Sequence, residues 1–320
     1  MRLPRRLLPR FLRLTLRRSL GRGRTALLVL ASLALLLTAC SEDQPGGGRP
    51  RVLATTSVIA GFAKAIAADD ATVVTLVPAG VDIHAYDPPV SAAREIARAG
   101  VLLVNGCNLE QNLLDAILLN RGDGSLLAAV SATADELQRE SVEGVARATC
   151  DPHRWLDAAR AMQYALAIGA ALAAADPAHS AGYAERTRAL VQELAALDAE
   201  LRQTLDAVPA ERRRIVVFHD AFAYFAASYG FELSASVLPS GSGQDPSAGA
   251  VADVVELVRR SAVPAVFHEP QFPSRVLELV AEETGARMLV LYSIPIPGQV
   301  DSYAEMMRAN ARALVDGLAP

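Results

Sequence analysis

The sequence predicts an α/β protein with two similar lobes, each a parallel sheet flanked by helices, joined by one long helix. Short apolar runs bounded by turn residues alternate with helical stretches from Arg51 onward, and strands that alternate with helices form parallel sheets. The same alternation starts again at Arg214. Between the two series, residues 176–208 read as a single helical segment. We therefore expect an N-terminal lobe over residues 51–175 and a C-terminal lobe over residues 209–320.

The strands and helices of the two lobes follow from these patterns. In the first lobe, strands are predicted at 51–56, 72–77 and 101–104, and helices at 58–68 and 91–99. In the second lobe, strands are predicted at 215–218, 265–267 and 288–292, and helices at 251–261, 274–284 and 302–318. Gly100 ends one of these helices, as glycine does after many helices.

The linking helix has clear signals at both ends. Asp176 and Pro177 suit the N-cap and first turn, and Pro209 ends the segment. About thirty residues at 1.5 Å each would extend about 45 Å, enough to span both lobes. Five leucines lie along one stripe of the helix: Leu190, Leu194, Leu197, Leu201 and Leu205. The stripe suits packing along two lobes, and it would suit a coiled coil or a dimer helix equally well.

Charge is segregated along the chain. Residues 1–39 contain nine of the 31 Lys and Arg and no Asp or Glu, so the remaining residues have a net charge of −13. An acidic body of this kind is unsuited to the phosphate backbone, and we expect no nucleic-acid partner. The apolar share of 52% also excludes a disordered chain.

The N-terminus has the parts of a secretory signal. Basic residues up to Arg24 precede an apolar run at 26–37, which is too short for a spanning helix of about twenty residues. The following Thr38-Ala39-Cys40 resembles the bacterial lipobox, in which the cysteine is diacylated. We therefore predict a lipoprotein signal peptide at 1–39, lipidation of Cys40, and a flexible tether at 40–50. The body would be extracytoplasmic, in the periplasm or on the outer face of the cell membrane. An uncleaved N-terminal anchor is the alternative.

Cysteine usage agrees with export. With Cys40 assigned to the lipid, Cys107 and Cys150 remain as an even pair in an oxidising compartment. A disulfide between them would stabilise the fold by about 4 kcal/mol in the chain-entropy model. Two buried free thiols are the alternative. A cysteine metal site is less favoured, because neither residue has a close cysteine partner.

Three of the five histidines lie where metal ligands could converge. His84 follows the strand at 72–77, His219 ends the strand at 215–218, and His153 opens a helix. Ligands of open α/β sheets bind at the carboxyl ends of strands, and imidazole suits zinc and its neighbours. Carboxylates that could orient the rings are Asp82, Asp157 and Asp220. The separations of 69 and 66 residues form no local signature, so spacing alone leaves a metal site and solvated histidines both open.

Six motifs in a fixed order resolve this choice. They are IHAYDPP at 83–89, NGCNLE at 105–110, DPHRWLD at 151–157, HDAFAYF at 219–225, EPQF at 269–272 and YAEMMRAN at 303–310. Over residues 51–320 this ordered set resembles the zinc/manganese-type substrate-binding lipoproteins of metal ABC transporters, the cluster A-I solute-binding proteins. The resemblance implies one metal ion in the cleft between the lobes. It implies His84 and His153 as ligands from the first lobe and His219 from the second.

The sequence departs from this family pattern in two places. Many relatives supply an aspartate ligand after the strand that matches 288–292, and here Ile294 stands at that position. Glu269, Asp301, Asp82 or a water must then fill the fourth position. Residues 110–150 also lack the histidine-rich loop that some zinc importers have. Of the remaining histidines, we expect His179 to be exposed and His268 to lie near the site at most, with Trp155 in the core.

These observations predict an extracytoplasmic receptor that captures a divalent metal and delivers it to the permease of an ABC importer. Three imidazoles without an obligatory aspartate, and a zinc-like EPQF motif, favour Zn²⁺, with Mn²⁺ the alternative. A metallochaperone or adhesin on the same scaffold is a second reading. A three-histidine zinc hydrolase is a third, disfavoured because no His-Glu-x-x-His motif or general base is evident. We expect a monomer that is not an enzyme.

Overall fold

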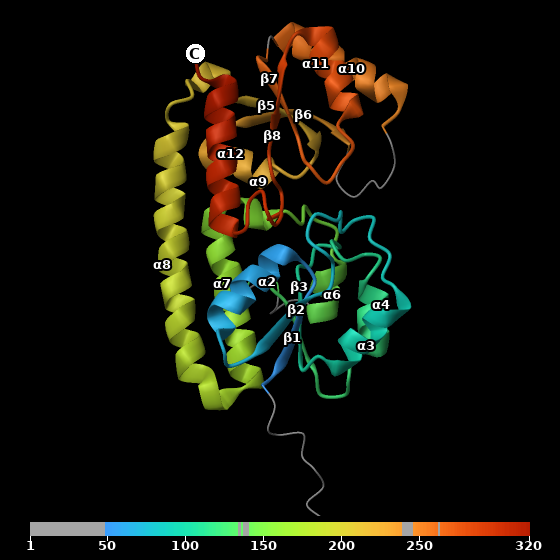
Figure 1. Cartoon of the computed structure of the whole chain (residues 1–320), viewed down its shortest axis with the longest axis vertical. Coiled ribbons are helices and arrows are strands. Elements are labelled where there is room, and N and C mark those ends of the chain that lie inside the picture. Colours follow the sequence, from blue (N-terminus) through green and yellow to red (C-terminus); the bar gives the residue numbers. More distant parts are fainter. Residues whose placement is uncertain (1–48, 134–135, 137–140, 239–245, 262) are drawn as a thin grey trace, which may run out of the picture. The chain divides into compact units, whose positions relative to one another are not determined.

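The computed structural model describes residues 49–320, apart from 134–135, 137–140, 239–245 and 262. The predicted signal peptide at 1–39, Cys40 and most of the tether at 40–50 lie outside the described residues. The described part contains two four-stranded parallel sheets with helices on their faces and a long helix that joins the two halves (Figure 1). The predicted fold class is therefore confirmed.

The first sheet has the strand order β2-β1-β3-β4. Its strands are β1 (Arg51–Ala54), β2 (Thr72–Thr75), β3 (Val101–Val104) and β4 (Leu126–Ala129). The helices of this lobe are α2 (Ser57–Ala67), α3 (Val90–Arg98), α4 (Leu114–Asn120) and α6 (Val142–Arg147). Strand β1 ends earlier than predicted because Thr56 leaves the sheet to cap α2, where its hydroxyl accepts a hydrogen bond from the Ile59 amide at 3.2 Å. Strand β4 and helices α4 and α6 were not predicted.

The second sheet repeats this arrangement, with the order β6-β5-β7-β8. Its strands are β5 (Arg214–His219), β6 (Glu232–Leu238), β7 (Ala265–His268) and β8 (Arg287–Val290). The helices are α9 (Ala223–Tyr229), α10 (Ala248–Ser261), α11 (Arg275–Thr284) and α12 (Tyr303–Leu318). Strand β8 ends before the predicted residue 292 because Tyr292 bonds through its backbone N–H and C=O to the Asn310 side chain, both at 2.8 Å. The matching strand order confirms that the two halves are alike.

Two helices connect the sheets. Helix α7 (Ala158–Ala175) leads through the 3₁₀ turn Pro177–His179 into α8 (Ser180–Leu205), so the long helix begins later than predicted. Helix α8 runs beside α7 and α12, which belong to opposite ends of the molecule in Figure 1. The leucine stripe of α8 is buried in these contacts within the chain, Leu190 partly. Among the described helices, α7 is long and apolar enough to cross a membrane, but eight of its residues are buried in the protein core.

The core follows the two-residue period of the strands. Val52 of β1 and Val217 of β5 belong to one continuous apolar cluster beneath α2, α7, α8 and α12. Their neighbours Leu53 and Val216 face the opposite sides of the two sheets, in separate clusters beneath the outer helices of each lobe. One core therefore passes from the first sheet to the second, and a second layer of helices covers each sheet.

The close approach of α7 and α8 depends on Gly169. A Cβ at this position would overlap the Thr187 hydroxyl and lie 3.1 Å from the Thr187 Cβ. The hydroxyl cannot turn away without losing its 2.7 Å bond to the Tyr183 carbonyl. We expect Gly169→Ala to destabilise the protein by about 1–3 kcal/mol in urea denaturation, because overpacking outweighs the better helix propensity of alanine. The matched control is Gly61→Ala on α2, where nothing outside the local helix backbone lies within 4 Å of the new Cβ. There we expect a gain of about 0.5–1 kcal/mol.

Candidate metal centre

The three predicted histidines come from three different parts of the chain and meet at one point. His84 lies between β2 and α3, His153 precedes the 3₁₀ turn Arg154–Leu156 that leads into α7, and His219 is the last residue of β5. One ring nitrogen of each lies within 4.8 Å of those of the other two. The residues are 8%, 1% and 5% exposed, respectively. The fold thus brings together ligand candidates from both sheets.

The rings are packed against one another rather than separated by other side chains. The Nε2 atoms of His84 and His153 lie 3.2 Å apart. The ring centroids of His219 lie 4.9 Å from His153 and 5.3 Å from His84. Both ring nitrogens of His219 are buried without a hydrogen-bond partner among the described residues. Buried nitrogen atoms are rarely left unpaired, so this cluster is suited to an ion that accepts their lone pairs.

The cavity beside the rings is small, at about 20 Å³, which is the space of one water-sized ligand. Trp155, predicted as a core residue, is buried and also lines this cavity, with its ring 5.3 Å from that of His153. Ile294 lines the cavity too, so the position that the resemblance assigns to an aspartate ligand presents an apolar side chain.

An aspartate that the sequence reading missed orients His153. The Asp151 Oδ1 atom accepts from the His153 backbone N–H at 3.0 Å and from its Nδ1 at 2.9 Å, which leaves Nε2 for a metal. The sequence could have indicated this contact, because an aspartate side chain in a turn commonly accepts from the backbone N–H two residues further on. The predicted role of Asp157 is wrong: its carboxylate caps α7 by accepting from the Ala159 N–H at 2.9 Å. Asp82 bonds to the backbone N–H of His84 at 3.0 Å, not to its ring.

Of the three carboxylates predicted as candidates for the fourth ligand, two lie near the histidine cluster and one does not. Asp82 lines the cavity. Glu269 lies beside His219, with 3.4 Å between its Oε1 and the His219 Nδ1. Asp301 lies apart from the cluster: it accepts from the Gly298 N–H at 2.7 Å ahead of α12 and lines a different cavity. The prediction that includes Asp301 among the candidates for the fourth position is therefore wrong.

Neither of the two remaining histidines lines this cavity. His179 is half exposed and pairs with Asp176, with 2.7 Å between its Nδ1 and the carboxylate. This agrees with its predicted exposure. His268 ends β7 and is not among the residues that line the cavity.

Burial and charge set different protonation states for the three rings. Burial, together with the neighbouring His153 and His219, lowers the pKa of His84 to about 3. Burial also lowers the pKa of His153, although the bond to Asp151 opposes this. Burial alone would lower the pKa of His219, but the nearby negative charges of Glu269, Asp82 and Asp220 outweigh it, and the pKa is raised. As the pH falls, therefore, His219 is the first of the three rings to take up a proton, and a metal must then displace that proton.

This difference predicts the pH dependence of metal binding. Below the raised pKa of His219, one proton is released per ion bound, so affinity is expected to fall by about tenfold for each unit that the pH falls. Above that pKa the affinity is expected to level off. Competition titrations with Zn²⁺ between pH 5.5 and 8.5 measure the slope. A slope near three would contradict this assignment, because it requires all three rings to be protonated in the free protein.

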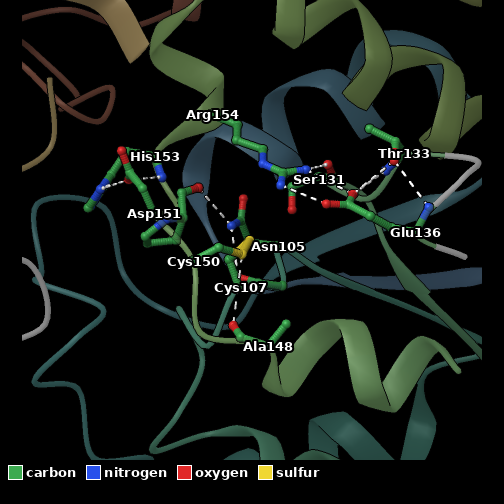
Figure 2. Close-up of a disulfide and its surroundings, with 12 residues drawn as sticks. Asn105, Cys107, Ser131, Thr133, Glu136, Ala148, Cys150, Asp151, His153 and Arg154 are labelled. Carbon is green, nitrogen blue, oxygen red and sulfur yellow. Dashed lines mark hydrogen bonds and ion pairs between the residues drawn. A yellow bond between two sulfur atoms is a disulfide. The ribbon is translucent and has the colours of Figure 1, made fainter. Parts of the chain in front are cut away.

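A disulfide lies next to the His153 segment (Figure 2). Cys107 and Cys150 are bridged, with their Cα atoms 5.0 Å apart, as predicted. Cys107 belongs to the loop that follows β3, and Cys150 directly precedes Asp151. The Asn105 Nδ2 donates to the Pro152 carbonyl at 3.0 Å and forms a second link between the two segments. The bridge therefore joins the end of β3 to the segment that carries His153.

The loop that holds Cys107 is unusual in its backbone. Gly106, Cys107 and Asn108 have positive φ angles of 97°, 52° and 57°. The buried Glu110 stabilises its start by accepting from the backbone N–H groups of Asn105 and Gly106, at 2.6 and 3.1 Å. Burial raises the pKa of Glu110, since its hydrogen bonds only partly offset desolvation. Such a backbone is held by its surroundings, here by the disulfide and a buried carboxylate.

Two α/β lobes that together bury a cluster of three imidazoles are typical of a receptor that binds a metal ion. Comparison with known proteins agrees. Residues 52–317 match the model of the family described as zinc-uptake complex component A, periplasmic. The chain belongs to this family.

Individual relatives bind different metals. The manganese-binding lipoprotein MntA of Halalkalibacterium halodurans is 28% identical over 91% of this chain and 97% of its own. The iron-binding protein YfeA of Yersinia pestis is 29% identical over 90% and 94%. The zinc-binding protein TroA of Treponema pallidum is 32% identical over 77% and 79%. The solved TroA structure matches with a TM-score of 0.77 at 29% identity, covering 85% of this chain and all of that one.

These findings establish the class of protein. The chain is an extracytoplasmic metal-binding component of the substrate-binding type found in metal ABC transporters. Members of this family are transport proteins, so the hydrolase reading is set aside.

Proposed function

We propose that this protein captures Zn²⁺ with His84, His153 and His219 and delivers it to the permease of an ABC importer. The observation that carries the proposal is the buried cluster of three imidazoles around an ion-sized cavity. Nitrogen donors suit zinc, whereas manganese prefers more oxygen ligands. Mn²⁺ is the alternative, since named relatives bind manganese or iron as well as zinc.

The fourth position is proposed to hold a water. Ile294 offers no ligand atom, and the Asp82 carboxylate is bonded to the backbone of His84. Three histidines and one oxygen would give the tetrahedral coordination that zinc adopts most often.

The N-terminal segment is proposed to hold this receptor at the membrane. Lipidation of Cys40 would leave residues 40–50 as a flexible tether, and a Gly-rich tether of this kind lets the body move to a membrane partner. We propose that the receptor acts as a monomer.

Metal titration with structural readouts tests the function. We expect one Zn²⁺ per chain, with three nitrogen and one oxygen neighbours in X-ray absorption spectra. Trp155 is the only tryptophan in the sequence and lies beside His153, so its fluorescence reports on the site. An oxygen-rich six-coordinate shell would contradict the zinc assignment. Loss of zinc uptake on deletion of the gene would separate an importer component from a metallochaperone or adhesin.

A further inference from the structure

A buried carboxylate lies beside the His219 ring with one of its two oxygens unpaired within the described part of the chain. Glu269 is 1% exposed, and its Oε1 has no hydrogen-bond partner among the described residues. This oxygen lies 3.4 Å from His219 Nδ1, close enough for a small ring rotation to complete a hydrogen bond. An isolated buried carboxylate is costly, so a nearby positive charge would stabilise it strongly. The centre that can supply that charge is the imidazole cluster.

The other oxygen of Glu269 is held in place. Gln271 Nε2 donates to Glu269 Oε2 at 2.9 Å and to the Ser293 hydroxyl at 2.8 Å. The Ser293 carbonyl accepts from Trp155 Nε1 at 2.6 Å, and the Trp155 ring packs on His153. A continuous set of contacts therefore runs from His219 in the second lobe to His153 in the first. The carboxylate is fixed relative to both lobes.

This inference rests on the proposed function. We propose that Glu269 is a positioning residue that accepts the Nδ1–H of His219, which commits Nε2 of that ring to the metal. Its negative charge offsets one charge of the ion without direct ligation. The role matters here because Ile294 provides no carboxylate on the cavity wall. Carboxylate–histidine–metal contacts of this kind fix the tautomer of the ligand ring and raise its basicity.

Zn²⁺ affinities of Glu269 variants, measured on the full chain purified in detergent, separate the effect of the carboxylate charge from that of side-chain packing. Glu269→Gln keeps the shape and removes the charge, and we expect Zn²⁺ affinity to fall about 10- to 100-fold. Glu269→Asp keeps the charge on a shorter side chain and is expected to lie between Glu269→Gln and wild type. The matched control is Glu282→Gln, at an exposed position on α11 of the same lobe, with unchanged affinity expected.

A second readout reports on the ring itself. In the Co²⁺-loaded protein the Nδ1–H protons of ligand histidines give shifted NMR signals. We expect the His219 Nδ1–H to be protected from solvent exchange in wild type and to exchange faster in Glu269→Gln, which keeps the shape of the side chain but is a weaker acceptor. A residue that only fills space would leave this exchange rate unchanged, as Glu282→Gln is expected to do.

The possible outcomes are distinct. Failure of the wild-type chain to bind Zn²⁺ or Co²⁺ would overturn the proposed function and this inference with it. Wild-type binding with an unchanged affinity of Glu269→Gln would overturn this inference alone. So would a Glu269→Asp variant that binds more weakly than Glu269→Gln, because the charge would then have no role.

Discussion

Replacing His153 with alanine is expected to weaken Zn²⁺ binding by about 100-fold or more. This histidine is the most buried of the three, and its Nε2 lies 3.2 Å from that of His84. A protein zinc site with four ligands binds with roughly 10–16 kcal/mol, so the loss of one ligand removes about 3 kcal/mol. Competition with a chromophoric chelator measures this change. His84→Ala and His219→Ala are expected to behave in the same way.

The chain offers a matched control for these variants. His179 is half exposed and pairs with Asp176 away from the cavity, so His179→Ala is expected to retain wild-type affinity. A His153→Ala variant with wild-type affinity would remove that residue from the site. Equal losses in the His179 and His153 variants would point to a general effect on folding.

Removing the disulfide is expected to have the largest effect on the stability of the fold. The bridge joins residues 43 positions apart, and its loss costs about 4 kcal/mol in the chain-entropy model. For a chain of this size that corresponds to a fall in Tm on the order of 10 °C, measured by calorimetry on the Cys107→Ser, Cys150→Ser double variant. Zn²⁺ affinity is also expected to fall, by up to about tenfold, because the bridge orders the segment that carries Asp151 and His153.

Thiol labelling of the unfolded chain without reductant provides the control. Neither Cys107 nor Cys150 is expected to react until a reductant is added. Labelling of both before reduction would show that the bridge is absent from the protein. A fall in Tm with unchanged Zn²⁺ affinity would limit the bridge to a role in stability.

The strands predicted from sequence are those with a clear apolar run. Val101–Val104 is buried at every position and was predicted with the correct bounds. Leu126–Ala129 was missed because its Leu and Ala residues favour helix as much as strand, and only packing at the sheet edge decides. Glu232–Leu238, also at an edge, alternates with Ser234 and Ser236 and is only half buried, so its apolar signal is weak.

The site was predictable in part. His84 and His219 could be placed at strand ends from sequence, but that these residues meet His153 follows from long-range packing, which only the family resemblance indicated. Glu269 was among the candidates, yet its position behind the His219 ring depends on how the loop after β7 packs against β5. Asp301 was wrongly included because its distance along the sequence from the ligand strands says little about its position in space.

The core shared by the two lobes bears on how long an ion stays bound. Helices α7, α8 and α12 bury apolar side chains of both sheets in one cluster, so wide separation of the lobes would expose it. Each 100 Å² of apolar surface exposed costs roughly 2.5 kcal/mol, which slows any release that needs such opening. We therefore expect small movements of the segments that carry the histidines to set the residence time of the ion on the free protein. A membrane partner that moves those segments when it docks would shorten the residence time of the ion. The rate of metal release would then depend on the partner as well as on the receptor.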